Sequence, residues 1–285
     1  MMTLEPRHAR SWLFTPADRP ERYPRRRSWS RDEPGADAVI LDLEDAVAPA
    51  RKLHARECLF RRSSDDLPVW VRINDRTSDH WRDDLAAVAL LPAVTGVMLP
   101  KTERADDVAA TAALLPGALP IVALVETSLG IENAFGIASE PATFALAFGV
   151  ADFRRETGLG DAPEAWAYPR TRLVIASRAA GLRGPIDGPA LQLDDVTAVR
   201  SEAARSGAGG FTGKLCVHPS QISPVNAAYS PGPEQVAWAR RVLEQAAASD
   251  GAAVRVDGEM IDRPRLEHAR GLLESAAAQG GAEIF

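Results

Sequence analysis

The chain has 285 residues and a formal net charge of −6, with 46% hydrophobic and 25% charged residues. This length can bury one large core, and α/β barrels commonly fold as a single domain of this size. The acidic balance supplies no overall basic field for nucleic acid or for an anionic membrane surface, so we expect no nucleic acid and no membrane partner and favour small molecules.

Short apolar runs recur along the chain, each followed by a turn and a stretch with helical periodicity. Their continuous apolar character indicates strands that are buried on both faces, as in a parallel sheet covered by helices. The predicted strands are Ser11–Pro16, Ala38–Glu44, Val69–Asn74, Gly96–Lys101, Pro120–Glu126, Phe144–Gly149, Leu182–Asp187 and Phe211–His218. This series of strand–helix units predicts a closed (β/α)8 barrel, the TIM-barrel fold.

Segments between the strands are rich in Ala, Leu, Glu and Arg, and several open with an Asp or Ser that can cap a helix. The predicted helices are Asp83–Leu91, Ala105–Leu115, Ser128–Ala138, Asp194–Ser206, Glu234–Ser249 and Arg263–Gln279. Because the pattern beyond Pro231 is helical, we expect a barrel over residues 1–230 and a helical C-terminal extension over residues 231–285.

The cysteines and the N-terminal segment bear on the cellular compartment. Cys58 and Cys216 stand far apart and in no CxxC or Cys/His spacing, which argues against a structural zinc site or a disulfide framework. The polar segment Met1–Arg10 lacks the apolar core of a secretory signal, and no apolar run reaches the length of a membrane helix. We therefore expect a cytoplasmic protein.

Charged side chains close successive predicted strands. In a barrel of this kind the active site lies at the C-terminal ends of the strands. A single charge there is most simply a side chain leaving the core for solvent, whereas a succession of them with both signs favours a site. The residues concerned are Asp42, Glu44, Asp45, Arg72, Asn74, Lys101, Glu126 and Asp152.

Glu126 and Asp152 are the candidate metal ligands. They follow neighbouring strands, and Gly149 is expected to let the backbone turn so that Asp152 points inward. Carboxylates without nearby His or Cys suit a hard cation, and Mg²⁺ is usually held by one or two of them with water and substrate completing its shell. The pair therefore predicts a magnesium site.

The acidic segment after the second predicted strand offers a rival set of ligands. Alternation along the strand should send Asp42 and Glu44 to one face and Leu43 to the other. We expect Glu44 and Asp45 to lie one step out from the metal, where they hydrogen-bond to its water molecules.

Arg72 and Lys101 are the candidate cationic groups of the site. The guanidinium of Arg72 suits a bidentate hold on a carboxylate, or the stabilisation of an enolate oxygen. Lys101 fits a ligand contact, a Schiff-base nucleophile or a partner for Glu103. Nearby acidic residues argue against the lowered pKa that a Schiff base needs. His218 also closes a strand, where a structural role is at least as plausible as a catalytic one.

Several segments together carry a family resemblance. They are SWLFTPADRPER (Ser11–Arg22), GADAVILDLEDAV (Gly35–Val47), VRIN (Val71–Asn74), GVMLPK (Gly96–Lys101), ALVET (Ala123–Thr127), LAFGVAD (Leu146–Asp152), GKLCVHPSQISPVN (Gly213–Asn226) and DGEMIDRP (Asp257–Pro264). In this order, and over nearly the whole chain, they resemble the citrate lyase beta subunit-like proteins of the HpcH/HpaI aldolase/citrate lyase superfamily.

The resemblance implies a Mg²⁺-dependent carbon–carbon lyase of the oxo-acid-lyase type, with Mn²⁺ as a substitute metal. Its substrate would be a 3-hydroxyacyl-CoA thioester of the malyl-CoA, citramalyl-CoA or citryl-CoA type, and its products an acyl-CoA such as acetyl-CoA and a 2-oxo acid. By motif, Glu126 and Asp152 would hold Mg²⁺, Arg72 would contact the thioester or enolate oxygen, and Glu44 and Asp45 would order the metal's waters.

The resemblance also implies contacts beyond the metal. Arg19 would lie near the coenzyme A or phosphopantetheine arm, and we group Lys101 with it as a candidate contact to the thioester. Asp262 would reach the site of a neighbouring subunit as a catalytic group, which implies a homo-oligomer, a trimer or a hexamer. Two alternatives stay open: malate synthase- or thioesterase-like activity on the same thioesters, and a citrate lyase beta subunit that acts on an acyl-carrier protein within a complex.

Overall fold

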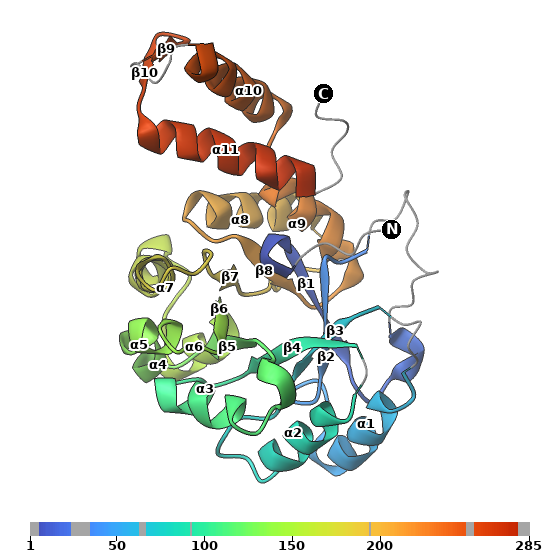
Figure 1. Ribbon diagram of the computed structural model, residues 1–285. Helices are drawn as coiled ribbons and strands as arrows, with labels where there is room; N and C mark the ends of the chain where they lie inside the picture. Colours follow the sequence, from blue (N-terminus) through green and yellow to red (C-terminus); the bar gives the residue numbers. More distant parts are fainter. Residues whose placement is uncertain are drawn as a thin grey trace. The chain divides into compact units, whose positions relative to one another are not determined.

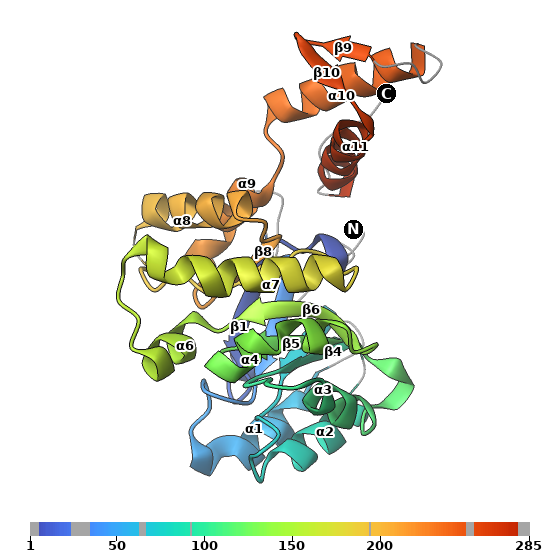
Figure 2. The same cartoon turned by 90° about the vertical axis from the view of Figure 1, so that its left-hand side faces the viewer.

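The computed structural model describes residues 6–23, 35–62, 67–91, 93–193, 195–248 and 254–278 (Figures 1 and 2). The chain divides into two compact units, one of Ala9–Ala228 and one of Met1–His8 with Tyr229–Phe285. Within the described residues, no helix is long and apolar enough to span a membrane. The predicted helix ends at Asp194, Ser249 and Gln279 lie outside the described residues.

The first unit is a closed parallel barrel whose strands follow one another in sequence order, with the last strand paired to the first (Figure 1). The strands are β1 (Ser11–Pro16), β2 (Ala38–Asp42), β3 (Val69–Arg72), β4 (Val94–Leu99), β5 (Ile121–Val125), β6 (Thr143–Phe148), β7 (Ile186–Asp187) and β8 (Gly213–Cys216). This confirms the predicted (β/α)8 fold.

The predicted strand over Leu182–Asp187 is much shorter in the structure, where only Ile186–Asp187 pairs. The amide of Leu182 donates instead to the carbonyl of Ser177 at the end of the preceding helix. Pro185 has no amide hydrogen to give to a strand ladder. The apolar composition of the segment therefore reflects its burial more than its backbone pairing.

Helices surround the strands of the first unit. They are α1 (Lys52–Leu59), α2 (Trp81–Ala89), α3 (Ala105–Ala112), α4 (Ser128–Glu132), α5 (Ala134–Ala138), α6 (Val150–Thr157), α7 (Ala167–Ala179), α8 (Val196–Ala208) and α9 (Ile222–Tyr229). Short 3-10 helices in this unit are η2 (Pro20–Arg22), η3 (Pro49–Arg51), η4 (Pro116–Ala118), η5 (Pro163–Trp166) and η6 (Pro219–Gln221), and η1 (Pro6–His8) belongs to the second unit. Each of these begins at a proline, whose fixed φ and missing amide hydrogen suit a helix start.

The helix predicted over Ser128–Ala138 is divided at Asn133 into α4 and α5. The side-chain amide of Asn133 donates to the carbonyl of Glu103 at 2.9 Å, so this residue is committed to a partner outside the helix. The backbone of Asn133 keeps its helical bonds across the division, with its amide donating to Leu129 and its carbonyl accepting from Ile137.

Apolar side chains fill the barrel interior. The buried core contains Ala9, Trp12, Ala38, Ile40, Trp70, Met98, Val122, Leu124, Ala145, Ala147, Ile186 and Leu215. The rings of Trp12 and Trp70 meet edge to face at 5.2 Å between centroids. A Cβ on Gly96 would lie 2.4 Å from the Trp70 ring, so this glycine makes room for the indole. The barrel is a packed core, and any site must lie at one of its ends.

A buried ion cluster joins the outer side of the barrel to its helices. Asp187 and Lys214, both 0% exposed, pair at 3.0 Å between β7 and β8. Arg170 of α7 also pairs with Asp187 at 2.7 Å, and Glu202 of α8 pairs with Lys214 at 2.7 Å. Burial alone would raise the pKa of Asp187, but Lys214 and Arg170 hold it below its usual range. The cluster fixes α7 and α8 against the strands.

The second unit contains the hairpin of β9 (Val254–Val256) and β10 (Glu259–Ile261) between α10 (Pro233–Ala248) and α11 (Arg263–Ala278). Its core consists of Ala239, Val242, Val256, Ile261 and Ala269. The two helices agree with the predicted ones, whereas the sequence analysis predicted no hairpin between them. The turn is Asp257-Gly258, both at positive φ (51° and 87°), as an Asp-Gly hairpin turn requires.

Candidate active site

A charged layer lies above the apolar interior, at the C-terminal ends of the strands. Successive strand residues point to opposite faces, so the inward direction of Ile40, Trp70 and Leu124 continues two residues later at Asp42, Arg72 and Glu126. All three of these polar residues are buried, at 1%, 9% and 4% exposure. Burial of unlike charges at the mouth of a barrel requires close pairing.

Arg72 is the best anchored side chain of this layer. Its Nε and Nη2 atoms donate to the two carboxylate oxygens of Asp42 at 2.7 and 2.5 Å. Its Nη1 atom lies 3.1 Å from Glu44 and 3.9 Å from Asp45, and its guanidinium lies 4.4 Å from the centroid of the Phe14 ring. Burial alone would lower the pKa of Arg72, but Asp42 and Glu44 raise it. The guanidinium therefore stays charged and fixed in direction.

Asp42 organises the loop that follows β2. Besides Arg72, its Oδ1 atom accepts from the amide of Glu44 at 2.8 Å, and its Oδ2 atom accepts from the amide of Ala46 at 3.1 Å. Both oxygens are thus occupied by the protein itself. Asp42 orients Arg72 and leaves no carboxylate oxygen for a metal.

Glu44 lies between two cations. Its Oε2 atom faces Arg72, and its Oε1 atom accepts from Nζ of Lys101 at 3.0 Å. Burial raises the pKa of Glu44, against the opposing effect of Arg72 and Lys101. Asp45, by contrast, is 66% exposed and only approaches Arg72. Both residues were predicted to order metal-bound water. Glu44 is buried in the charged layer, whereas Asp45 is exposed.

Glu126 is a buried carboxylate with one fixed oxygen. Its Oε1 atom accepts from the backbone amide of Lys101 at 2.8 Å, and no described residue donates to its Oε2 atom. Burial, then Glu44 and Asp152, raise the pKa of Glu126 to about 8, against the Lys101 amide and Arg72. Acidic side chains thus gather here with too little positive charge to offset them.

Gly149 leaves space for the side chain of Glu126. It was predicted instead to allow the backbone turn that leads to Asp152. Its φ of −87° and ψ of 79° need no glycine. A Cβ at this position, however, would lie 2.2 Å from Oε2 and 2.5 Å from Cβ of Glu126. The glycine at the end of β6 makes the space that the carboxylate of β5 occupies.

Asp152 lies in the first turn of α6, where a carboxylate is favoured by the helix dipole. Its side chain is 19% exposed and pairs with the 75% exposed Arg155 at 3.1 Å. The next residue, Phe153, packs its ring against Phe148 and Trp166 at 5.4 and 6.2 Å between centroids. This aromatic contact fixes the start of α6, and with it the position of Asp152.

The donor set consists of carboxylates, which fit a hard cation such as Mg²⁺. In the described part of the chain, no group of at least three His, Cys, Asp or Glu side chains is arranged to hold a metal ion. Mg²⁺ does not need such a group, because it keeps several waters and commonly takes one or two carboxylates. Glu126, with an unpartnered oxygen and a raised pKa, and Asp152 beside it meet that description. A cation here would offset the excess negative charge.

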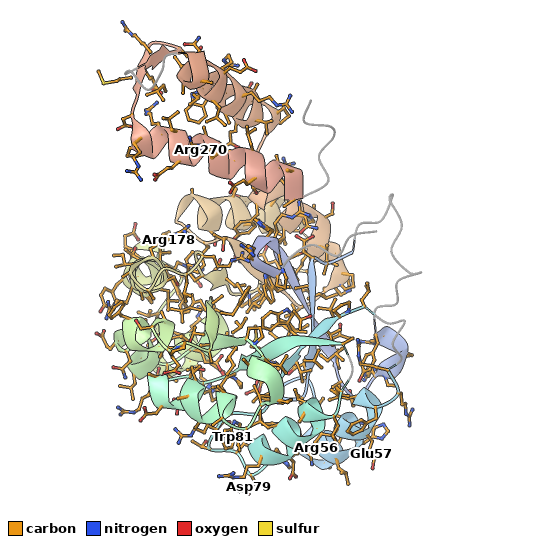
Figure 3. The ribbon with its side chains drawn as sticks, in the orientation of Figure 1. Arg56, Glu57, Asp79, Trp81, Arg178 and Arg270 are labelled. Atoms are coloured by element: carbon orange, nitrogen blue, oxygen red, sulfur yellow. The ribbon has the colours of Figure 1, made fainter. Side chains whose placement is uncertain are left out.

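A buried lysine supports the loop that carries Glu44. Nζ of Lys52 donates to the carbonyls of Leu43 and Glu44 at 2.6 and 2.7 Å and to the Asn74 side chain at 2.8 Å. Asn74 also donates to Asp84, which pairs at 3.0 Å with Arg56, labelled in Figure 3. The sequence pattern indicates Asn74, which ends a predicted strand, but not Lys52, because a lysine in a helix gives no sign of an inward role.

The other predicted residues have the following partners. Arg19 is exposed, and its side chain has no bond to any residue that the structure describes. Asp262 belongs to the second unit, where its Oδ1 atom accepts from the amide of Arg265 at 3.1 Å and caps α11. His218 caps η6 by accepting from the amide of Ser220. Lys101 pairs with Glu44 and Asp75 rather than with Glu103.

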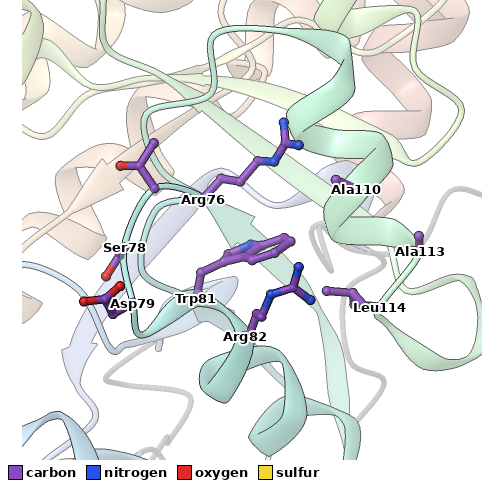
Figure 4. Close-up of a pocket in the computed structure, with 9 residues that line it drawn as sticks. Arg76, Ser78, Asp79, Trp81, Arg82, Ala110, Ala113 and Leu114 are labelled. Carbon is purple, nitrogen blue, oxygen red and sulfur yellow. The ribbon is translucent and has the colours of Figure 1, made fainter.

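A groove on the outside of the barrel is separate from the charged layer. It has a volume of about 600 Å³ and lies between the loop after β3 and helix α3 (Figure 4). Trp81 lies between Arg76 and Arg82, and the opposite wall is apolar. Arg76 is already paired with Asp107 at 2.8 Å, so the groove has little unbalanced charge.

The chain is similar to known proteins over most of its length. The family described as HpcH/HpaI aldolase/citrate lyase matches residues 13–219. A "Citrate lyase subunit beta-like protein" of Mycobacterium tuberculosis (strain CDC 1551 / Oshkosh) is 40% identical over 273 residues, which cover 93% of this chain and 94% of that protein. A "(3S)-malyl-CoA thioesterase" of Cereibacter sphaeroides (strain ATCC 17029 / ATH 2.4.9) is 34% identical over 253 residues, covering 85% and 87%.

A solved structure is similar over the same length. The crystal structure of protein CitE from Mycobacterium tuberculosis in complex with magnesium, acetoacetate and coenzyme A matches with a TM-score of 0.78 and 36% sequence identity. The match covers 95% of this chain and 99% of that chain. That protein therefore binds magnesium and coenzyme A on the same barrel architecture.

Proposed function

Because the chain belongs to the HpcH/HpaI aldolase/citrate lyase family, we propose that it is a Mg²⁺-dependent lyase that cleaves a 3-hydroxyacyl-CoA thioester into an acyl-CoA and a 2-oxo acid. The observation that carries the proposal is the charged layer at the barrel mouth. There a fixed guanidinium, Arg72, and a buried carboxylate, Glu126, lie at the ends of strands whose inward-facing positions they continue. The guanidinium of Arg72 and the carboxylates proposed to bind the metal together suit a reaction that passes through an enolate.

Glu126 and Asp152 would hold the metal. When bound, Mg²⁺ lowers the cost of negative charge on the oxygen of the hydroxy or oxo acid, which makes the carbon–carbon bond easier to break. Glu126 is fixed through Lys101, and Asp152 through the helix that Phe153 anchors. Glu126 directly follows β5 and Asp152 lies in the helix that follows the neighbouring strand β6, so their carboxylates would approach a ligand from one side of the mouth.

Arg72 would stabilise the thioester enolate that the cleavage leaves behind. A guanidinium has more N–H groups than those directed at Asp42 and Glu44, so donors remain for a substrate oxygen. Because Asp42 holds the group in place before substrate arrives, little reorganisation is needed as the charge develops. Removal of a donor of this kind typically costs about a hundredfold or more in turnover.

Proton transfer is the role we assign to Asp262 of a neighbouring subunit, in a trimer or hexamer. Within its own unit only the Oδ1 atom is engaged, as the cap of α11, and the side chain is exposed. A carboxylate at an exposed helix start can be presented to another subunit. Arg19 and its loop would contact the coenzyme A arm.

A second activity has support from one of the relatives. The Cereibacter sphaeroides protein, 34% identical, is a (3S)-malyl-CoA thioesterase, which hydrolyses the thioester that a lyase would cleave at a carbon–carbon bond. Both reactions use the same kind of substrate. Action on an acyl-carrier protein within a citrate lyase complex is the third alternative, supported by the name of the beta-like relative.

The products separate these activities. Purified protein is incubated with Mg²⁺ and a panel of short 3-hydroxyacyl-CoA esters, including malyl-CoA and citramalyl-CoA. Cleavage of the carbon–carbon bond yields a 2-oxo acid and an acyl-CoA without a free thiol, whereas hydrolysis yields a free thiol without a 2-oxo acid. We expect the first pattern. Activity only after addition of an acyl-carrier protein would contradict a free-standing lyase.

A further inference from the structure

Lys101 has an unusual backbone conformation for a side-chain-bearing residue. It follows β4 with a φ of +48°, in the left-handed region that residues other than glycine rarely adopt. A glycine would adopt this conformation readily. The conformation aims the backbone amide and the side chain of one residue at two different carboxylates.

The backbone amide of Lys101 is directed at Glu126. It donates to Oε1 at 2.8 Å, and Glu126 is 4% exposed. This bond leaves Oε2 as the oxygen of Glu126 that faces a ligand. Any residue other than proline at position 101 would supply the same amide, so this contact does not depend on the lysine side chain.

The ammonium group of Lys101 is directed at Glu44. It donates to Oε1 at 3.0 Å and lies 3.8 Å from Asp75. Arg72 holds the other oxygen of Glu44 at 3.1 Å. With a cation on each oxygen, Glu44 has no free oxygen for a metal, although Lys101 contacts both this carboxylate and that of Glu126.

The turn that carries Lys101 is held independently of its side chain. The amide of Thr102 donates to the carbonyl of Leu124 at 3.1 Å, and its hydroxyl donates to the carbonyl of Leu99 at 2.8 Å. A Cβ on Gly130 would lie 2.6 Å from the Thr102 carbonyl, so α4 packs directly on the turn. Replacement of the lysine side chain should therefore leave the turn in place.

We propose that Lys101 is a positioning residue for metal selectivity: its amide presents Glu126 to the metal, and its ammonium keeps Glu44 from becoming a third carboxylate ligand. The inference rests on the proposed function only in taking Glu126 and Asp152 as the metal ligands. Mg²⁺ takes few carboxylates and keeps its waters, whereas Ca²⁺ takes more oxygen ligands in flexible geometry. A site limited to two carboxylates thus favours Mg²⁺.

The test compares Mg²⁺ and Ca²⁺ binding by calorimetry, without substrate, on the full chain and its variants. Lys101→Met removes the charge at similar length, and Lys101→Gly removes it while keeping the amide and relieving the positive φ. In both variants we expect Ca²⁺ affinity to rise by about tenfold and Mg²⁺ affinity to rise by less, because a cation is lost and Glu44 is released. Lys101→Arg retains the charge and should keep the wild-type ratio of affinities.

Three results would overturn the proposal. An unchanged Ca²⁺/Mg²⁺ ratio in Lys101→Met and Lys101→Gly would remove the side chain from metal selection. A higher KM for the thioester at an unchanged ratio would place Lys101 in substrate binding instead. Loss of metal binding in Lys101→Arg together with a lower melting temperature would make its role structural. A chain that cleaves no thioester can still show the ratio change, so the two proposals fail separately.

Discussion

At the scale of single residues, the charge state of Glu126 sets the pH behaviour of the barrel mouth. Burial and the neighbouring carboxylates raise its pKa from 4.5 to about 8. Between these values the unfolded chain ionises this group while the folded chain keeps it protonated. The folded state then binds more protons, so the free energy of unfolding falls as pH rises through this window.

Metal-free protein should therefore lose stability between about pH 5 and pH 8, by an amount on the order of a few kcal/mol. Denaturation in urea at several pH values measures the slope. Glu126→Gln mimics the protonated group, so the variant should lack this part of the loss and exceed the parent in stability at pH 8. Identical pH profiles for parent and variant would contradict the assignment.

Asp42 and Asp45 give a matched test of what burial adds to an ion pair with Arg72. Asp42 is 1% exposed and bonded in two places, whereas Asp45 is 66% exposed at 3.9 Å. Removing one partner of a buried pair costs about 3–5 kcal/mol, while an exposed pair contributes about 0–1 kcal/mol. We expect Asp42→Asn to destabilise by about 3 kcal/mol in urea denaturation and Asp45→Asn by less than about 0.5 kcal/mol. Equal effects would refute the anchoring role.

At the scale of elements, the spacing of β5 and β6 at their ends depends on Gly149. A methyl group there would occupy the position of the Glu126 carboxylate. The substitution Gly149→Ala should displace that carboxylate and weaken Mg²⁺ binding by about tenfold or more, measured by calorimetry. Gly136→Ala is the control, because a Cβ on this helical glycine of α5 meets nothing within 4 Å and should leave binding unchanged. Unaltered Mg²⁺ affinity in Gly149→Ala would move the metal elsewhere.

Most strands could be predicted closely, because a strand that is buried on both faces consists of a continuous run of apolar residues. Features that depend on contacts between distant segments could not be predicted from the sequence. The predicted helix divides at Asn133, whose side chain bonds to the distant Glu103, and Pro185 precedes the short β7 within an apolar run. The hairpin turn could have been predicted, because the pair Asp257-Gly258 is a typical hairpin-turn sequence. The prediction for this region considered only its helical pattern.

The polar residues at the barrel mouth could also be predicted from the sequence. They end strands, and alternation along β2 sends Asp42 inward and Leu43 outward. What the sequence could not supply is which oxygen each cation occupies. The pairing of Glu44 with both Arg72 and Lys101, and the support from Lys52, follow from loop packing.

At the scale of the whole molecule, the family relation predicted from the sequence motifs is confirmed, as is the barrel. The roles of the individual site residues and the sharing of a site between subunits stay predictions. The sharing matters most for Asp262, which belongs to a different compact unit from the charged layer.

Loss of Asp262 as a general acid or base should lower turnover by at least about a hundredfold while Mg²⁺ binding is retained. If the group acts in a neighbouring subunit, mixing Asp262→Ala with Glu126→Gln subunits should restore up to about a quarter of the sites at random assembly. Asp152→Asn mixed with Glu126→Gln is the control, since both residues lie in one barrel and no site is restored. Equal rates for both mixtures would rule out sharing.

We propose that the two carboxylates at the barrel mouth support metal-dependent cleavage of a carbon–carbon bond. The most direct measurement is the release of 2-oxo acid from a 3-hydroxyacyl-CoA ester as Mg²⁺ is titrated into metal-free wild-type protein and Glu126→Gln. We predict saturable release by the wild type and at least about a hundredfold less by the variant. Release that is independent of Mg²⁺, or equal in the two proteins, would contradict the account.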